Sequence, residues 1–212
     1  MTRVAILDYG MGNLRSASKA LEHVGVETEV TRDPARIVAA DGVVLPGVGA
    51  FPKAMEAVRA LGYGELLAER VARGVPLLGI CLGMQLLFER TDELGGAEGL
   101  ALLEGDVAQL DAPGLKVPEI GWNTVAWRRP SALTEGLPEP TAFYHVHSFA
   151  ARPARDSDVL GTAVYGRPFA SAVARPPVYG VQFHPEKSGP DGLRLLGNFA
   201  RICERAALGA AA

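Results

Sequence analysis

Apolar residues over the first 90 positions fall into two alternating patterns. Strand-like segments, with Val, Ile or Leu at their ends or centres, cover 4–7, 26–30, 41–45 and 75–80. Between these segments, apolar residues recur at the three- and four-residue spacing of a helix, as at Leu14, Ala17, Leu21 and Val24. The expected helices cover 14–24, 51–73 (one broken helix or two short ones) and 82–90. This alternation predicts an α/β fold whose mostly parallel sheet is covered by helices.

From Leu102 onward, short strand-like runs are separated by Pro and Gly. The expected strands are 105–110, 121–127, 142–149, 158–165, 169–174 and 178–183. No long polar linker precedes them, so we expect a mixed or antiparallel extension of the same sheet within a single domain, residues 1–212. A last helix over about 190–207 has an apolar face that includes Cys203, which we interpret as a small buried hydrophobic residue.

Composition narrows the class of protein. A chain of 212 residues, 48% of them apolar, can bury a substantial core. The net charge of -3 and the scattered Lys and Arg argue against a nucleic-acid partner. The longest apolar stretch, 75–88, is shorter than the roughly 20 residues that cross a bilayer, and residues 1–10 resemble a strand and turn more than a signal peptide. We therefore expect a cytoplasmic protein without a membrane span, with both cysteines free.

One cysteine lies between two glycines at the end of an apolar strand. Gly79-Ile80-Cys81-Leu82-Gly83 has the form G-x-C-x-G, the thiol counterpart of the nucleophile elbow. In such a sharp strand-to-helix turn, a flanking Cβ would collide with neighbouring backbone. The helix that starts at Leu82 would offer free N–H groups and the positive end of its dipole, which favour a thiolate. The competing interpretation of the pentapeptide alone is a buried structural cysteine.

A thiol nucleophile benefits from a base and from a group that orients the base. His184 follows an apolar strand, Pro185 fixes the turn, and the Glu186 carboxylate could lie at the same sheet edge. We expect Cys81, His184 and Glu186 to form a triad, although a surface histidine beside a proline turn is the alternative. The Pro46-Gly47-Val48-Gly49 loop could supply N–H donors to a tetrahedral oxyanion. It could also be an ordinary turn, and it lacks the Gly-Lys-Ser/Thr of a phosphate-binding loop.

The motifs PGVG, GICLGMQ and FHPE, in this order and spacing, resemble those of the class I, triad-type glutamine amidotransferases. Further segments are similar to the glutaminase subunits of imidazole glycerol phosphate synthase, from histidine biosynthesis. These segments are DYGMGNLRS (8–16), LPGVGAF (45–51), IGWN (120–123), YHVHS (144–148) and QFHPEKS (182–188). The resemblance covers essentially the whole chain and implies a flavodoxin-like fold and no cofactor or metal.

The resemblance also implies roles for individual residues. Cys81 would attack the side-chain amide of glutamine to form a γ-glutamyl thioester and release ammonia, with His184 moving the proton and Glu186 orienting it. The oxyanion hole would use the N–H of Leu82 and a donor from Gly47, Val48 or Gly49. The positions that match the family's glutamine-binding residues are Gln85, Glu93, Ser148 and Phe149.

In this family, ammonia passes to a cyclase subunit with a β/α-barrel fold, which forms imidazole glycerol phosphate and aminoimidazole carboxamide ribonucleotide. The resemblance therefore implies a heterodimer, and a peptide flip in the 46–49 loop would couple glutamine turnover to the partner. The positions that match partner-facing residues are Asn13, Trp122, Tyr144 and Lys187.

Two positions depart from the family pattern, and several alternatives stay open. Glu119 precedes IGWN where the family usually has His, and His145 replaces a commoner aromatic residue. His145 and His147 form an H-x-H pair that could bind a metal, although no third ligand is evident. The chain could instead be another amidotransferase subunit, serving pyridoxal phosphate synthase or anthranilate synthase. A non-catalytic redox module with Cys81 as a sensor thiol is the alternative from another class.

Overall fold

A computed structural model describes residues 2–210. Within this range, nine strands form the main sheet in the order β2-β1-β3-β4-β13-β12-β11-β8-β9. The parallel strands are β2 (Glu27–Thr31), β1 (Arg3–Leu7), β3 (Gly42–Gly47), β4 (Leu77–Cys81) and β13 (Val178–Val181). The antiparallel strands are β12 (Arg167–Arg175), β11 (Val159–Tyr165), β8 (Glu119–Trp127) and β9 (Thr141–His147). The parallel half has the flavodoxin-like order, so the expected fold class is confirmed.

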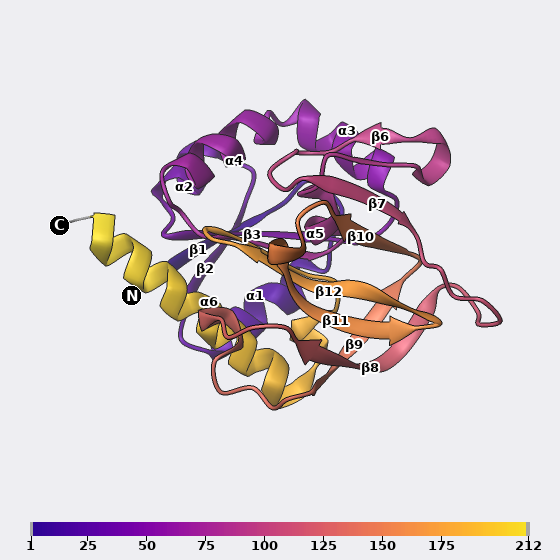
Figure 1. Cartoon of the computed structure of the whole chain (residues 1–212). Coiled ribbons are helices and arrows are strands. Elements are labelled where there is room, and N and C mark those ends of the chain that lie inside the picture. The colour runs from indigo at the N-terminus through magenta and orange to yellow at the C-terminus, as the bar shows by residue number, and fades with distance from the viewer. Residues whose placement is uncertain (1, 211–212) are drawn as a thin grey trace.

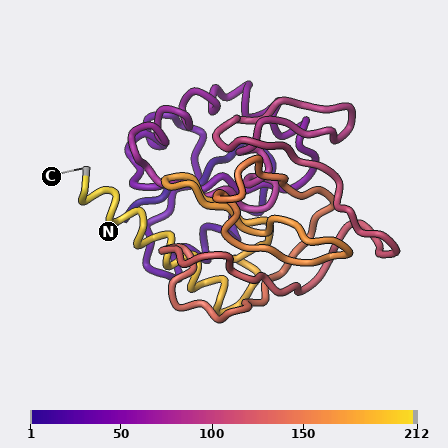
Figure 2. The backbone as a smooth tube through the Cα atoms, in the orientation of Figure 1, coloured from indigo at the N-terminus to yellow at the C-terminus, as the bar shows by residue number. Residues whose placement is uncertain are grey.

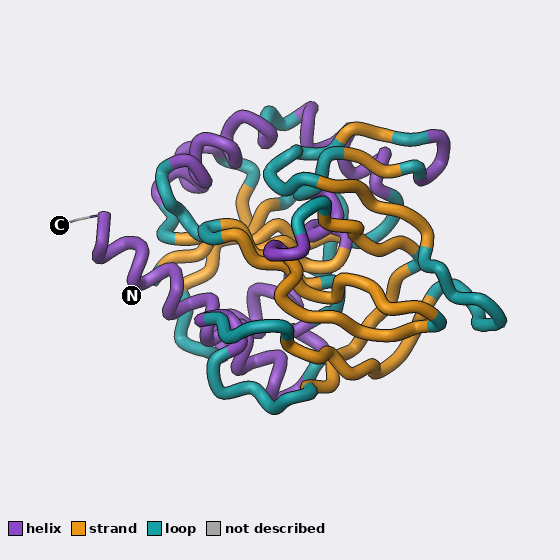
Figure 3. The backbone as a smooth tube through the Cα atoms, in the orientation of Figure 1, coloured by secondary structure: helices purple, strands orange, loops and turns teal. Residues whose placement is uncertain are grey.

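Helices cover both faces of the parallel half (Figures 1 and 3). Alternate residues of a strand point to opposite faces, and β1 shows the result: Val4 and Ile6 belong to one apolar core, Ala5 and Leu7 to the other. The first core includes α1 (Leu14–His23) and α6 (Gly189–Ala210). The second includes α2 (Pro34–Ala39), α3 (Phe51–Ala60), α4 (Tyr63–Ala72) and α5 (Leu82–Leu86). Strand β1 is therefore apolar on both faces because both faces of the sheet are covered by helices.

A second sheet corrects one prediction. The strand expected at 105–110 does not extend the main sheet: β7 (Gly105–Gln109) pairs with β10 (Phe149–Pro153) and β5 (Arg90–Thr91), and β5 pairs with β6 (Ala97–Glu98). The chain leaves the main sheet at Ser148, where the expected strand 142–149 is divided between β9 and β10. Val107 and Ala151 then pack into the core that contains α3 and α4. The apolar face of this sheet thus covers one side of the molecule.

The helices differ from expectation at a few boundaries. Residues 51–73 form two helices, which separate at Gly62 with φ +68°. Helix α5 ends at Leu86, several residues before the expected end, because the chain turns into β5. The sequence pattern did not predict α2, which Asp33 caps by accepting from the Ala35 N–H. Cys203 on α6 is fully buried, which confirms its interpretation as a core residue.

The remaining elements are short. Single 3₁₀ turns lie at Glu93–Gly95, Ala132–Thr134, Asp156–Asp158 and Pro185–Lys187. Figure 2 shows the loop between β7 and β8, residues 110–118, projecting from the body of the molecule. Among the helices of residues 2–210, none has the length and apolar character to cross a membrane.

The order of the parallel strands brings three sequence-distant segments together. In register, Gly47 at the end of β3 lies opposite Cys81 at the end of β4, and Val181 at the end of β13 lies opposite Ile80. The carboxyl ends of parallel strands share one edge of the sheet, which is where α/β proteins place their sites. The glycine loop, the cysteine and the segment that contains His184 therefore converge.

Candidate active site

Cys81 lies in a strained turn that its two flanking glycines make possible. It is the last residue of β4 and has φ +55° and ψ -113°, a backbone conformation that residues other than glycine rarely adopt. A Cβ on Gly79 would lie 2.7 Å from Met84 N and Gly83 O. A Cβ on Gly83 would lie 2.7 Å from the Leu45 carbonyl carbon and nearer still to its oxygen. The expected steric reason for both glycines is thus confirmed.

His184 and Glu186 lie beside this turn as a buried pair. Their side chains approach within 2.9 Å, from His184 Nδ1 to Glu186 Oε1. Burial alone would lower the pKa of His184, but hydrogen bonds to Cys81 and Glu186 and the charges of both groups outweigh it and raise the pKa to about 9. The structure therefore brings the three predicted catalytic side chains together, with His184 disposed to be protonated at neutral pH.

The edge strand β9 holds this arrangement with backbone groups that no neighbouring strand uses. The His184 N–H donates to Tyr144 O at 2.9 Å. Two residues farther along the same side of β9, Val146 O lies 3.8 Å from Cys81 Sγ. Ser188 Oγ donates to His184 O at 2.6 Å and accepts from the Tyr144 N–H at 3.0 Å. The free side of an edge strand thus holds the backbone of His184 and contacts the thiol of Cys81.

Cys81 opens into a cavity of about 330 Å³. Its lining contains the four predicted glutamine-binding residues Gln85, Glu93, Ser148 and Phe149, together with His184, Leu82, Val48, Gly49, Pro118, Val146, His147 and Lys187. Gly47 does not line this cavity. It lines a much smaller one, which also contacts Asn13, His184 and Glu186. The predicted site residues therefore line two cavities, which share Val48 and His184.

The glycine loop approaches the nucleophile closely. A Cβ on Gly47 would contact Leu82 Cβ at 3.0 Å and would overlap the hydroxyl of Tyr9. Tyr9 Oη donates to Pro46 O at 2.6 Å in a buried hydrogen bond, and thus ties the loop to β1. Gly49 has φ +102°, which favours glycine. Sequence reasoning missed Tyr9, which lies two positions after β1, because its partner Pro46 is 37 positions away in the chain.

Two glutamines connect the cavity wall to the thiol. Gln85 Nε2 donates to Phe149 O at 2.9 Å and to Gln182 Oε1 at 3.0 Å. Gln182 Nε2 lies 3.7 Å from Cys81 Sγ. Sequence reasoning also missed Gln182, which is fully buried, although a polar residue inside an apolar strand run pointed to it. On the other wall, Glu93 Oε2 accepts from the Phe51 N–H at 2.8 Å.

The predicted partner-facing residues lie near the cavity at the surface. Trp122 is 60% exposed and packs edge-to-face against Tyr144, with ring centroids 6.2 Å apart. Lys187 Nζ lies 5.9 Å from the centroid of the Tyr144 ring. Asn13 is exposed at the start of α1, beside the smaller cavity. Trp122, Tyr144 and Lys187 therefore form one continuous surface.

His145 and His147 are buried and occupied by protein partners. His145 Nδ1 faces Phe143 O at 3.1 Å and Nε2 faces Ser171 Oγ at 2.8 Å. Burial lowers the pKa of His145 to about 4, and the nearby His147 acts in the same direction. No cluster of three or more His, Cys, Asp or Glu side chains suited to a metal occurs within residues 2–210.

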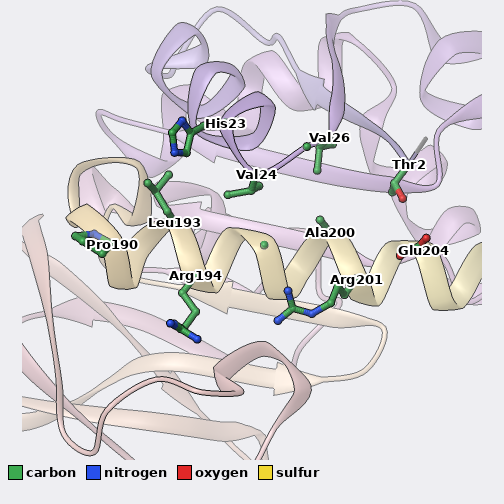
Figure 4. Close-up of a pocket in the computed structure, with 12 residues that line it drawn as sticks. Thr2, His23, Val24, Val26, Pro190, Leu193, Arg194, Ala200, Arg201 and Glu204 are labelled. Carbon is green, nitrogen blue, oxygen red and sulfur yellow. The ribbon is translucent and has the colours of Figure 1, made fainter.

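A larger hollow, about 650 Å³, lies between α1 and α6 (Figure 4). His23, Val24 and Leu193 line one part of it, whereas Arg194 and Arg201 point away from α1 in this view. It contains neither a thiol nor a residue of the triad. The 330 Å³ cavity is the candidate site because the strained Cys81 and the imidazole of His184, whose pKa is raised, open into it.

Solved structures share this architecture. The crystal structure of a glutamine amidotransferase aligns with a TM-score of 0.73 and 23% identity, covering 95% of this chain and 98% of that one. PurLQS from Thermotoga maritima aligns with a TM-score of 0.75 and 20% identity over 94% of this chain and 98% of that chain. At these identities, the likeness shows that the fold is shared.

Proteins related by sequence share a much higher identity with this chain. The family "Glutamine amidotransferase class-I" matches residues 5–203. The imidazole glycerol phosphate synthase subunit HisH of Moorella thermoacetica is 51% identical over 97% of this chain and 98% of its own length. The HisH subunits of Wolinella succinogenes and Bacillus cereus are 47% and 48% identical and cover 94% and 95% of this chain, and 99% and 95% of their own lengths. The chain therefore belongs to the class I glutamine amidotransferase family and, within it, to the HisH subunits of imidazole glycerol phosphate synthase.

Proposed function

We propose that this chain is the glutaminase subunit of imidazole glycerol phosphate synthase in histidine biosynthesis, and that it hydrolyses glutamine to glutamate and ammonia. The observation that carries the proposal is the strained Cys81 elbow, which faces the His184–Glu186 pair in one cavity. The relatives' names supply the pathway. The protein is then a cytoplasmic enzyme that acts as one domain of residues 1–212.

The proposed reaction has two steps. The Cys81 thiolate attacks the side-chain carbonyl carbon of glutamine, and the protonated His184 gives its proton to the amide nitrogen, which leaves as ammonia. Neutral His184 then takes a proton from water, which attacks the γ-glutamyl thioester and releases glutamate. The raised pKa of His184, about 9, supports its role as the acid of the first step. Glu186 keeps the ring oriented through Nδ1.

The oxyanion and the glutamine head group need separate partners. We assign the oxyanion to the N–H of Leu82, at the start of α5, and to a donor from Gly47, Val48 or Gly49. The close approach of Gly47 to Leu82 supports this assignment. For the head group we propose Gln85 and Glu93 with the backbone near Ser148 and Phe149, which all line the cavity of Cys81.

The proposed partner is the β/α-barrel cyclase subunit, which forms a heterodimer with this chain and receives its ammonia. The relatives are subunits of a synthase by name, and Trp122, 60% exposed, suits an interface anchor. We assign the contact with the partner to the surface formed by Trp122, Tyr144 and Lys187. We also assign it to Asn13, which lies beside the cavity of Gly47. Movement of the 46–49 loop would couple glutamine turnover to the partner.

A glutamine-analogue electrophile tests the chemistry directly. We expect 6-diazo-5-oxo-L-norleucine to alkylate Cys81 in the full chain, as read by peptide mass spectrometry, and the reaction to be lost in His184→Ala. Glutamate release should be absent in Cys81→Ala when it is assayed with the cyclase subunit bound. Alkylation of another residue, or glutamine turnover by Cys81→Ala, would refute the assignment.

A further inference from the structure

A buried acid and a buried histidine face each other across β8 and β9. Glu119 and His147 are partners in the strand register and are 3% and 6% exposed. His147 Nε2 lies 3.2 Å from Glu119 Oε2, off the line of an ideal hydrogen bond. Apart from this contact, neither atom has a hydrogen-bond partner within the described residues. Each polar atom therefore depends on the other for compensation of its burial.

The contacts of the two side chains indicate which ring nitrogen of His147 donates. His147 Nδ1 lies 2.8 Å from Phe149 O, and a carbonyl only accepts, so Nδ1 carries a proton. Two bare lone pairs at this distance would repel each other, so the contact between Nε2 and Oε2 is favourable only when one of the two atoms carries a hydrogen. Glu119 Oε1 accepts from Asn123 Nδ2 at 2.8 Å. Glu119 thus keeps the ring in the form that donates to Phe149.

His145 makes an informative contrast two residues earlier. Its Nε2 faces the Ser171 hydroxyl, which can donate, so a neutral ring satisfies both of its contacts. Both of its ring nitrogens are thereby occupied away from Phe149 and Gln85. The two histidines share one strand and comparable burial, but only His147 reaches the cavity wall.

The Phe149 carbonyl is the point where this pair meets the cavity. It accepts from His147 Nδ1 at 2.8 Å and from Gln85 Nε2 at 2.9 Å. Gln85 Nε2 uses its other hydrogen on Gln182 Oε1, which leaves Gln85 Oε1 as the amide's acceptor toward a ligand. A shift of the Phe149 carbonyl would therefore turn the Gln85 amide. Displacements of this kind are costly in a site that positions a reacting group.

We propose that Glu119 and His147 are positioning residues that hold the Phe149 carbonyl and, through it, the Gln85 amide in the orientation that binds glutamine. This inference rests on the proposed hydrolysis of glutamine. Because it concerns the fit of the substrate, binding of a glutamine analogue should weaken when the pair is broken, while the intrinsic reactivity of the thiol should stay unchanged.

Two electrophiles separate these effects on the full chain. Alkylation of Cys81 by 6-diazo-5-oxo-L-norleucine gives an inactivation constant KI and a maximal rate, and iodoacetamide reports on the thiol alone. We expect Glu119→Leu and His147→Phe each to raise KI about tenfold or more, with the iodoacetamide rate within about twofold of wild type. Circular dichroism and unfolding curves show which variants fold.

Glu119→Gln is the rescue variant, and His145→Phe is the matched control. A glutamine amide can donate to a neutral Nε2 while its oxygen accepts from Asn123, so Glu119→Gln should keep KI within about threefold of wild type. His145→Phe changes an equally buried neighbour and should also keep KI. Should Glu119→Leu fail to fold, His147→Phe and Glu119→Gln decide the question.

The outcomes are distinct. An unchanged KI in both disruptive variants would overturn the inference, as would an equal loss in His145→Phe or an equal loss of the iodoacetamide rate. If the wild-type chain itself is not alkylated at Cys81 by the analogue, the proposed function fails instead.

Discussion

The second residue of α5 gives a sharp test of the elbow. Gly83→Ala would place a Cβ against the Leu45 carbonyl, at less than the 3.0 Å that Cβ atoms ordinarily keep. The atoms it meets belong to the backbone of β3, so a side chain cannot turn away to relieve the overlap. Overpacking of a core costs typically 1–3 kcal/mol, and here β3 and the elbow would have to separate by about 1 Å or more. We expect a loss of about 3 kcal/mol or more in the free energy of unfolding.

Gly64→Ala is the matched control, because Gly64 is the second residue of α4 as Gly83 is of α5. A Cβ there would meet only Leu100 Cδ2, at an ordinary 3.9 Å. Alanine in place of glycine in a helix is favourable by up to about 1 kcal/mol. The two substitutions are chemically identical, so their stabilities should change in opposite directions.

Urea unfolding of both variants measures the difference, and thermal unfolding checks it. For a chain of this size, 1 kcal/mol corresponds to roughly 2–4 °C, so Gly83→Ala should lower the melting temperature by roughly 6–12 °C. It should also slow alkylation of Cys81, because the thiol moves with the turn. A Gly83→Ala protein within about 0.5 kcal/mol of wild type would refute the close approach of the elbow to β3.

Three further predictions concern the triad, the second cysteine and the surface. The pKa of His184 is raised from 6.5 to about 9 in the folded protein, so its stabilising contribution is complete below pH 6.5 and is lost as the pH rises through 9; the stability advantage over His184→Gln, measured in urea, should shrink across that window, and a constant advantage would contradict the pKa. Cys203 is fully buried and burial raises its pKa, so iodoacetamide should modify Cys81 alone in the folded chain; equal labelling in a peptide map would count against this. Trp122→Ala should weaken cyclase binding at least roughly tenfold in calorimetry with stability within about 0.5 kcal/mol of wild type, and unchanged affinity would remove Trp122 from the interface.

Local signals made the parallel half of the fold predictable. Apolar runs such as Val4–Leu7 contribute side chains to the cores on both faces of the sheet, and glycines follow the ends of the helices. Hydrophobic periodicity and the positions of glycine are therefore enough to predict these elements. Helix α2 was missed because only Ile37 on it is buried, which leaves almost no amphipathic pattern. Its start was nevertheless marked by Asp33 before Pro34. Helix caps, considered in addition to periodicity, would have predicted it.

The second sheet was not predictable in the same way. Strands β5 and β6 contain two residues each, and their pairing is set by β7 and by the core beneath it. Within the site, strand ends and glycines pointed to Cys81 and His184. Tyr9 and the Glu119–His147 pair were out of reach. The Tyr9 hydroxyl bonds a carbonyl 37 positions away, and strand register joins Glu119 to His147, 28 positions away.

One error of the sequence prediction lies beside the candidate site. A continuous strand over 142–149 would have kept all of its residues in the main sheet, with regular alternation of side chains between the two faces. The observed chain instead leaves the main sheet at Ser148. Before this break, Tyr144 O and Val146 O on the free edge of β9 contact His184 and Cys81. After it, Phe149 O, at the start of β10, contacts Gln85 Nε2 and His147 Nδ1. A local rule of strand continuity fails here because the break places the Phe149 carbonyl against Gln85, in the wall of the cavity that contains Cys81, and such failures are expected at functional sites.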